Sequence, residues 1–212
     1  MKYFLAFFIL IVFFMLLNYP EYFTTTPVLS NIDNKQYRVI TTFGDYKEAT
    51  DKLANINDFI INFLRYLKNK FIINRNGNKD EIKFVQRILN NYNPDNIFEN
   101  FPILGENTSF VINKGESFGI CLREKENHNF HTFSLLKFVI LHEMTHMGTI
   151  QYGHDYEFWS WFKFITIEAT KSGLYDPINY SNNNVNYCGL NITFNPYYDN
   201  NKYDWNTPKA NP

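Results

Sequence analysis

The stretch LHEMTHMGTIQYGHDYEFW, residues 141–159, holds three of the five histidines in the 212-residue chain. Residues 133–147 show helical periodicity and contain neither glycine nor proline, so they are expected to form an α-helix. His142 and His146 are four residues apart and therefore lie one turn apart on the same face of that helix. The sequence thus requires a helix here whose two imidazoles can reach a single metal ion.

Glu143 follows the first of these histidines. It suits the general base that takes a proton from water at the metal in the H-E-x-x-H arrangement. Gly148 and Gly153 leave the backbone free to turn back after the helix, which brings His154 to the site as a third nitrogen donor. Three protein ligands leave a fourth position for water, as in catalytic rather than structural zinc sites. The sequence therefore predicts a catalytic Zn²⁺ site with His142, His146 and His154 as metal ligands and Glu143 as the base.

Two other ligand arrangements fit this pattern less well. The metzincin motif H-E-x-x-H-x-x-G-x-x-H requires Gly and His where this chain has Thr149 and Tyr152, which excludes that class. A glutamate ligand from a later helix is conceivable through Glu157 or Glu168, but His154 makes either one unnecessary. The prediction is therefore a ligand set of histidines alone.

The spacing of the remaining histidines and of three tyrosines does not assign them to the metal site. His128 and His131 lack a spacing partner and are expected to be structural residues with satisfied hydrogen bonds. Tyr152, Tyr180 and Tyr187 are candidates for a second donor to the reaction's oxyanion, because a phenol on a loop could reach the metal. No spacing singles out one of the three.

The beginning of the chain has the character of a membrane segment. Lys2 precedes an unbroken apolar run over residues 3–17, and a helix up to Tyr19 would be about 25 Å long, close to the ~30 Å of a bilayer core. A cleaved signal peptide is the alternative, but the bulky residues that follow favour an uncleaved anchor. We expect residues 1–19 to be the transmembrane signal anchor of a single-pass protein in a viral or host endomembrane, 20–34 a tether, and 35–212 the catalytic domain, across the membrane from the N-terminus.

The chain between the tether and the histidines indicates an α+β fold. A β-branched and aromatic bias predicts a strand at 36–42, and apolar residues at helical spacing predict helices at 45–71 and 80–91. Residues 108–123 read as a β-hairpin that turns at Lys114 and Gly115, and the strand at 117–123 is expected to pair with an extended substrate. Asp155 is the expected N-cap of a last helix that stops at Gly173, and 190–194 is strand-like.

Charge and cysteine content limit the partners. The net charge of -1 and the pI of about 6.5 give no support to a nucleic-acid partner. Cys121 and Cys188 could form one disulfide or remain two buried thiols, and the sequence leaves both open. The oligomeric state is also left open.

The residues around the histidines resemble a known family. HEMTHMGTIQYGHDYEFWSWF is similar to WLM and SprT/Spartan-like zinc metallopeptidases, in which H-E-x-x-H is followed by a loop, a Gly-His or Pro-His pair and a helix beginning near Phe-Trp. NTSFVINKGESFGICLR, VILHEMTHM and YCGLNITFNP together resemble WLM-like metallopeptidases of large DNA viruses and some protists. The resemblance covers residues 37–196. It implies a zincin-like minidomain in which His142, His146 and His154 are zinc ligands and Glu143 is the catalytic base.

The expected function is that of a membrane-tethered zinc metallopeptidase acting on a protein or peptide substrate. The cellular families resemble nuclear proteases that cleave proteins crosslinked to DNA and carry basic DNA-binding regions. Because this chain has no such region, that role is not expected here. Two alternatives remain: a catalytically silent, membrane-anchored zinc-binding module for interactions, and a zinc hydrolase of a non-peptide amide. Glu143 favours catalysis over the first, since a purely structural site has no need of a base.

Overall fold

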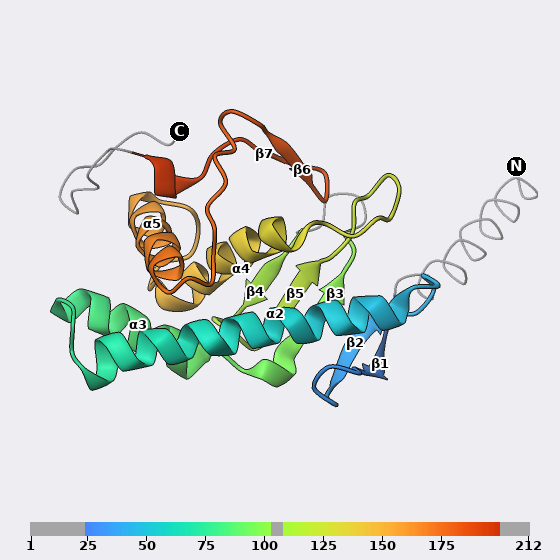
Figure 1. Ribbon diagram of the computed structural model, residues 1–212, viewed down its shortest axis with the longest axis horizontal. Helices are drawn as coiled ribbons and strands as arrows, with labels where there is room; N and C mark the ends of the chain where they lie inside the picture. Colours follow the sequence, from blue (N-terminus) through green and yellow to red (C-terminus); the bar gives the residue numbers. More distant parts are fainter. Residues whose placement is uncertain (1–23, 103–107, 200–212) are drawn as a thin grey trace, which may run out of the picture.

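A five-stranded mixed sheet forms one layer of the protein in the computed structural model (Figure 1), which describes residues 24–102 and 108–199. The strands are β1 (Thr25–Leu29), β2 (Gln36–Ile40), β3 (Ile97–Asn100), β4 (Phe110–Ile112) and β5 (Ser117–Cys121). They lie in the order β1-β2-β3-β5-β4. The strands β2, β3 and β5 are parallel to one another, whereas β1 and β4 pair antiparallel at the two edges.

Helices cover one face of this sheet. The long helix α2 (Tyr46–Leu67) and the helix α4 (Phe133–Gly148) each contact the sheet and also contact each other (Figure 1). Helices α3 (Lys79–Asn91) and α5 (Tyr156–Lys171) pack against α4 from further out. A separate hairpin of β6 (Val185–Tyr187) and β7 (Leu190–Ile192) follows α5 in sequence. Helix α4 is therefore central, and most of its residues are buried.

The ends of the helices follow local chemistry. The side chain of Asn78 accepts hydrogen bonds at the start of α3 and Glu81 reaches back, which completes a capping box. Asp155 accepts a hydrogen bond from the backbone N–H of Phe158 at 2.9 Å and caps α5, as predicted. Gly173 takes a φ of 74° just after α5 and ends it, also as predicted.

Most of the predicted elements are confirmed. The strand at 36–42 is β2, the helix at 80–91 is α3, the hairpin at 108–123 is β4 with β5, and the histidine helix is α4. The helix predicted at 45–71 is α2, which continues as a π-helical turn over Lys68–Ile73. The predicted α+β class is therefore correct.

The prediction that the strand at 117–123 has a free edge is wrong. The strand at 117–123 was expected to offer its backbone to a substrate, but β5 pairs with β3 on one side and with β4 on the other. Both of its edges are occupied, so no peptide can add to it. The sheet edge on this side belongs to β4.

The predicted tether contains folded structure. Thr25–Leu29, within the expected tether of 20–34, pairs in register with β2 and forms the other edge of the sheet. Pro27 is compatible with this position because an edge strand can leave one side of its backbone unpaired. The folded domain thus begins before residue 35. The expected anchor at 1–19 lies outside the described residues, and no helix within 24–102 and 108–199 is long and apolar enough to cross a bilayer.

A buried ion-pair network connects the sheet to the start of α2. Arg123, with a side chain only 1% exposed, donates to the Glu99 carboxylate at 2.7 Å and to Asp45 at 2.8 Å. The second oxygen of Glu99 accepts the backbone N–H of Ile40 at 2.8 Å. Burial raises the pKa of Glu99, and the Arg123 guanidinium opposes that rise. The network joins β2, β3 and the residue that precedes α2.

Candidate metal centre

The three predicted histidines converge. His142 and His146 project from α4, and the loop before α5 brings His154 back to them. The Nε2 atom of His154 lies 2.9 Å from Nε2 of His142 and 3.1 Å from Nε2 of His146. We call these residues the three-histidine cluster. Its donor atoms all lie within 4.8 Å of one another.

The donor set fits a zinc ion. Zinc–nitrogen bonds of 2.0–2.1 Å in tetrahedral geometry place ligand nitrogens about 3.3 Å apart, close to the separations in the cluster. Burial lowers the pKa of all three imidazoles, to about 4 for His146, and the neighbouring histidines add to the effect at His142. Neutral imidazoles carry the free lone pair that a metal needs. The cluster therefore favours binding of a metal cation over protonation of its imidazoles.

One aromatic ring supports the whole cluster. The ring of Phe158, in the first turn of α5, lies 4.8 Å from that of His142, 4.4 Å from that of His146 and 4.7 Å from that of His154, measured between centroids. Phe158 is itself buried. It therefore fixes the orientation of the imidazoles. The helix predicted to follow Asp155 includes this position, but the local sequence contains no sign of this role.

Glu143 lies beside the cluster in a buried position. Its side chain lines the same cavities as His142, and burial raises its pKa to about 8. A cation held by the three histidines would favour the carboxylate and so oppose that shift. The predicted base and the predicted ligands are therefore brought together as the spacing required.

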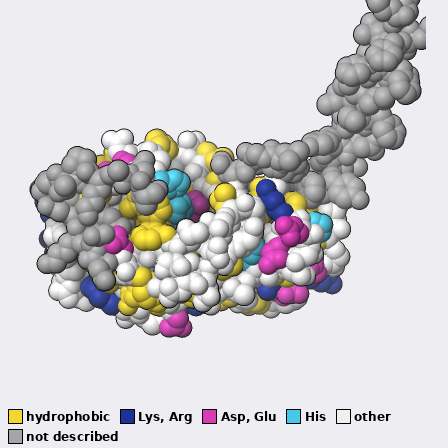
Figure 2. Space-filling model, turned by 90° about the horizontal axis from the view of Figure 1, so that it is seen from above, with side chains coloured by type: hydrophobic (Ala, Val, Ile, Leu, Met, Phe, Trp, Pro, Cys, Tyr) yellow, Lys and Arg dark blue, Asp and Glu magenta, His cyan; other side chains and the backbone are white. Residues whose placement is uncertain are grey.

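The cluster opens into a cavity of about 480 Å³. Phe110 and Val111 of the edge strand β4 line one side of it, and Tyr152 and Leu190 line other parts. Figure 2 shows histidine side chains reaching the surface next to apolar ones on the face viewed from above. An extended peptide could lie along β4 and cross the metal centre in this cavity.

Lys114 was not recognised from the sequence as part of the site. It occupies the turn between β4 and β5, and its ammonium group donates to the backbone oxygens of His146 and Gln151, each at 3.1 Å. It also lies over the ring of Tyr152, 4.5 Å from the centroid. Lys114 thus ties the β4–β5 turn to the end of α4 and to the loop that carries His154. Its spacing in the hairpin gave no signal of these long-range contacts.

The tyrosine candidates differ in their placement. The hydroxyl of Tyr187 donates to the backbone oxygen of Cys121 at 2.8 Å and is also bonded to Ser109. Tyr180 is buried against Phe138 and does not line the cavity. Tyr152 alone of the three has an exposed side chain at the cavity. It is the remaining candidate for an oxyanion donor.

The other residues that the sequence set aside have structural roles. Glu168 is paired with Lys70 at 2.5 Å and with Lys171 at 3.0 Å, and it is not part of the metal-binding group. His131 is buried beside Cys188, and exposed His128 packs on aromatic rings. Glu157 does not line the cavity. The preference for His154 as third donor is consistent with this geometry.

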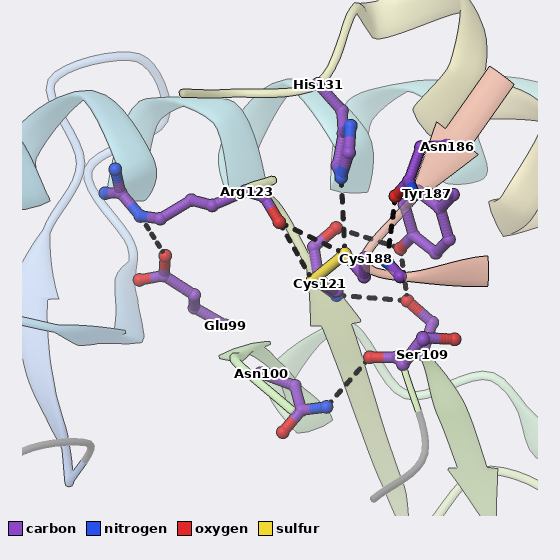
Figure 3. The surroundings of a disulfide bond; sticks show 11 residues. Glu99, Asn100, Ser109, Cys121, Arg123, His131, Asn186, Tyr187 and Cys188 are labelled. Atoms are coloured by element: carbon purple, nitrogen blue, oxygen red, sulfur yellow. Dashed lines mark hydrogen bonds and ion pairs between the residues drawn. A yellow bond between two sulfur atoms is a disulfide. The ribbon is translucent and has the colours of Figure 1, made fainter. Parts of the chain in front are cut away.

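Cys121 and Cys188, left open by the sequence, are joined in a disulfide (Figure 3). The surrounding polar groups reinforce the link. The Ser109 hydroxyl accepts the backbone N–H of Cys121 at 3.0 Å and bonds to the Tyr187 hydroxyl, and His131 Nε2 lies 3.2 Å from the Cys188 sulfur. The disulfide thereby fastens the β6–β7 hairpin to β5, beside the metal centre.

Reduction of this disulfide is expected to lower the free energy of unfolding by about 2–4 kcal/mol, because the bond closes a loop between residues 67 positions apart. Urea denaturation of the Cys121→Ser/Cys188→Ser protein, compared with the oxidised wild type, measures the effect. Zinc affinity should be unchanged, since neither cysteine belongs to the three-histidine cluster. Equal stability of the two proteins would contradict the expectation.

The fold and the site define an α+β protein with a candidate metal centre. The family model of the WLM domain matches residues 34–184, and the chain therefore belongs to the WLM family. Domains of this family are in general metallopeptidase-like. The resemblance inferred from the histidine region is confirmed.

The curated relatives are proteins of large DNA viruses. The chain is 29% identical over 169 residues to "Uncharacterized protein R325" of Acanthamoeba polyphaga mimivirus, which covers 78% of this chain and 81% of that protein. It is 34% identical over 91 residues to "Uncharacterized protein 136R" of Invertebrate iridescent virus 6, covering 42% of this chain and 51% of that protein. No solved structure matches the chain.

Proposed function

We propose that the protein is a zinc-dependent metallopeptidase with a zincin-like site that hydrolyses peptide bonds in protein substrates. The convergence of three histidine nitrogens beside a buried glutamate, at the wall of an open cavity, carries this proposal. The metallopeptidase-like character of the WLM family supports it. His142, His146 and His154 would hold the zinc ion.

Several residues of the site have separate roles in the proposed hydrolysis. Zinc, when bound, supplies a Lewis acid that polarises the scissile carbonyl and acidifies water. Glu143 takes a proton from the attacking water and delivers it to the nitrogen of the leaving amine. Phe158 keeps the imidazoles in place and excludes water from behind them. The phenol of Tyr152 is placed at the cavity, where it can donate to the oxyanion.

We also propose that residues 1–19 anchor this domain to a membrane, on the side away from the cytosol. The apolar run after Lys2 supports this, as does the disulfide, because disulfides persist in oxidising compartments. Protease protection of the domain in intact membrane vesicles tests it. Digestion of the domain before the vesicles are opened would reject the orientation.

Metal binding provides the direct test of the peptidase. We expect one zinc per chain by mass spectrometry, cleavage of unfolded casein, loss of cleavage after chelation and recovery on adding zinc. His154→Ala should lower zinc affinity by at least about 10–100-fold. Loss of a residue that only supports a metal ligand already costs that much, and His154 is proposed to be a ligand itself. His128→Ala is the matched control, since His128 is exposed and does not belong to the three-histidine cluster. Zinc-independent cleavage, or no cleavage by the zinc-loaded wild type, would reject the proposal.

A further inference from the structure

A second cavity adjoins the metal centre. It has a volume of about 250 Å³ and shares His142 and Glu143 with the larger cavity, but neither His146 nor His154 lines it. It therefore extends from the Glu143 side of the three-histidine cluster. Apolar and aromatic side chains from α4, α5 and the segment around β7 line it, among them Phe138, Val139, Trp159, Phe162, Ile192 and Phe194.

We propose that this apolar cavity receives the side chain of the substrate residue on the amine side of the scissile bond, and that it selects large apolar residues there. The assignment rests on the proposed peptidase function. It names a substrate class, namely polypeptides with residues such as Leu, Ile, Met or Phe immediately after the bond that is cut.

The chemistry of Glu143 decides which side of the scissile bond lies at this cavity. In hydrolysis the carbon–nitrogen bond breaks, the water oxygen stays on the carbonyl carbon, and a proton of the water passes through Glu143 to the nitrogen. That nitrogen must therefore lie on the Glu143 side of the metal. The residue that it belongs to has its side chain next to the cavity that begins at Glu143.

The selectivity of this cavity for large apolar side chains follows from the residues that line it. Among the residues that the structure describes, Glu143 is the only acidic or basic side chain other than histidine at this cavity, and Glu143 is engaged in the reaction. A charged substrate side chain would lose its hydration there without gaining a partner. A small side chain would leave the aromatic walls of Trp159 and Phe162 without contact. Discrimination in an apolar pocket is typically about 10–200-fold for each methylene group.

Another part of the wall comes from the β6–β7 hairpin and the residues that follow it. Residues 190–194 line the cavity, and Leu190 lies at the border with the larger cavity. The Cys121–Cys188 disulfide holds this hairpin against β5 (Figure 3). The pocket is therefore closed by a segment whose position is fixed covalently.

The first test is to sequence the products. Full-length protein loaded with zinc is incubated with unfolded casein, and the new N-termini are identified by mass spectrometry. We expect large apolar residues to be enriched at the first position at least about tenfold over alanine, glycine and charged residues. New N-termini that follow the composition of casein would overturn the pocket assignment while leaving the peptidase proposal intact. No cleavage at all would reject the peptidase proposal.

A variant that fills the cavity sharpens the test. Ile192→Trp should lower kcat/KM at least about tenfold for a peptide with Leu after the scissile bond, and much less for the same peptide with Ala. Ile178→Trp is the matched control, because Ile178 is exposed and lies outside the cavity lining. Equal losses for both peptides would count against the assignment.

A binding measurement tests the pocket assignment independently of catalysis. Trp159 lines the cavity, so its fluorescence should report occupation in the metal-free protein. Short peptides that begin with Phe should change the emission at concentrations at least tenfold lower than peptides that begin with Ala, and Trp159→Phe should remove that change. Equal responses to the two peptides would overturn the assignment whether or not the protein cleaves casein.

Discussion

Glu143→Gln is expected to lower kcat by about 10²–10⁴-fold while the protein retains one zinc per chain. The amide has nearly the same shape as the carboxylate and fits the buried position, but it cannot take a proton from water. Zinc should stay bound because the three histidines, and not Glu143, form the group proposed to hold it. Metal analysis and peptide kinetics on the same preparation measure both quantities.

Glu157→Gln is the matched control for this substitution. Glu157 lies in the first turn of α5, close to the site in sequence, but it lines neither cavity next to the cluster. Its kcat should stay within about twofold of the wild type, as for substitutions away from the reacting atoms. Cleavage that survives in Glu143→Gln would remove Glu143 from the mechanism. Zinc binding without cleavage in the wild type would instead favour the silent binding module.

Arg123→Met is expected to destabilise the protein by about 3–5 kcal/mol, because it leaves the buried Glu99 carboxylate without its counter-charge. The backbone N–H of Ile40 remains as a hydrogen-bond donor to Glu99 but does not neutralise it. Urea denaturation followed by circular dichroism measures the free energy of unfolding. Adding Glu99→Gln to the same protein should restore part of the loss.

Arg65→Met provides the comparison for Arg123→Met. Arg65 is exposed on α2, and within the part of the chain that the structure describes its side chain donates to the nearby Asn62. Its loss should therefore change the free energy of unfolding by less than about 0.5 kcal/mol. A loss of less than about 1 kcal/mol in Arg123→Met would mean that water or another group replaces the guanidinium, and that the network contributes little.

The sequence predicted the parts of the site that depend on local spacing. Two histidines four residues apart on a helix must share a face, and a glutamate between them must lie nearby, whatever the rest of the fold. The N-cap at Asp155 and the stop at Gly173 are equally local, and both are confirmed. These features depend on a few neighbouring residues and can be read without knowing the tertiary structure.

The parts that the sequence missed depend on contacts between distant segments. Strand order decides which strand has a free edge, and no local pattern shows that β4 rather than β5 lies there. The link from Lys114 to Gln151 crosses 37 positions, and Phe158 meets the imidazoles only because α5 packs on α4. Residues 190–194 line a cavity that also includes side chains of α4 and α5, and the disulfide joins the neighbouring Cys188 to β5.

The order of these segments along the chain also sets the order in which the protein is completed during synthesis. Helix α4 leaves the ribosome before the β6–β7 hairpin, so the H-E-x-x-H pair is available before the wall of the apolar cavity exists. That wall is fastened only after Cys188 has emerged and an oxidant has joined it to Cys121. Under the proposed function, a nascent chain would carry its zinc ligands before it could recognise a substrate, and the apolar cavity would be completed in the compartment that forms the disulfide.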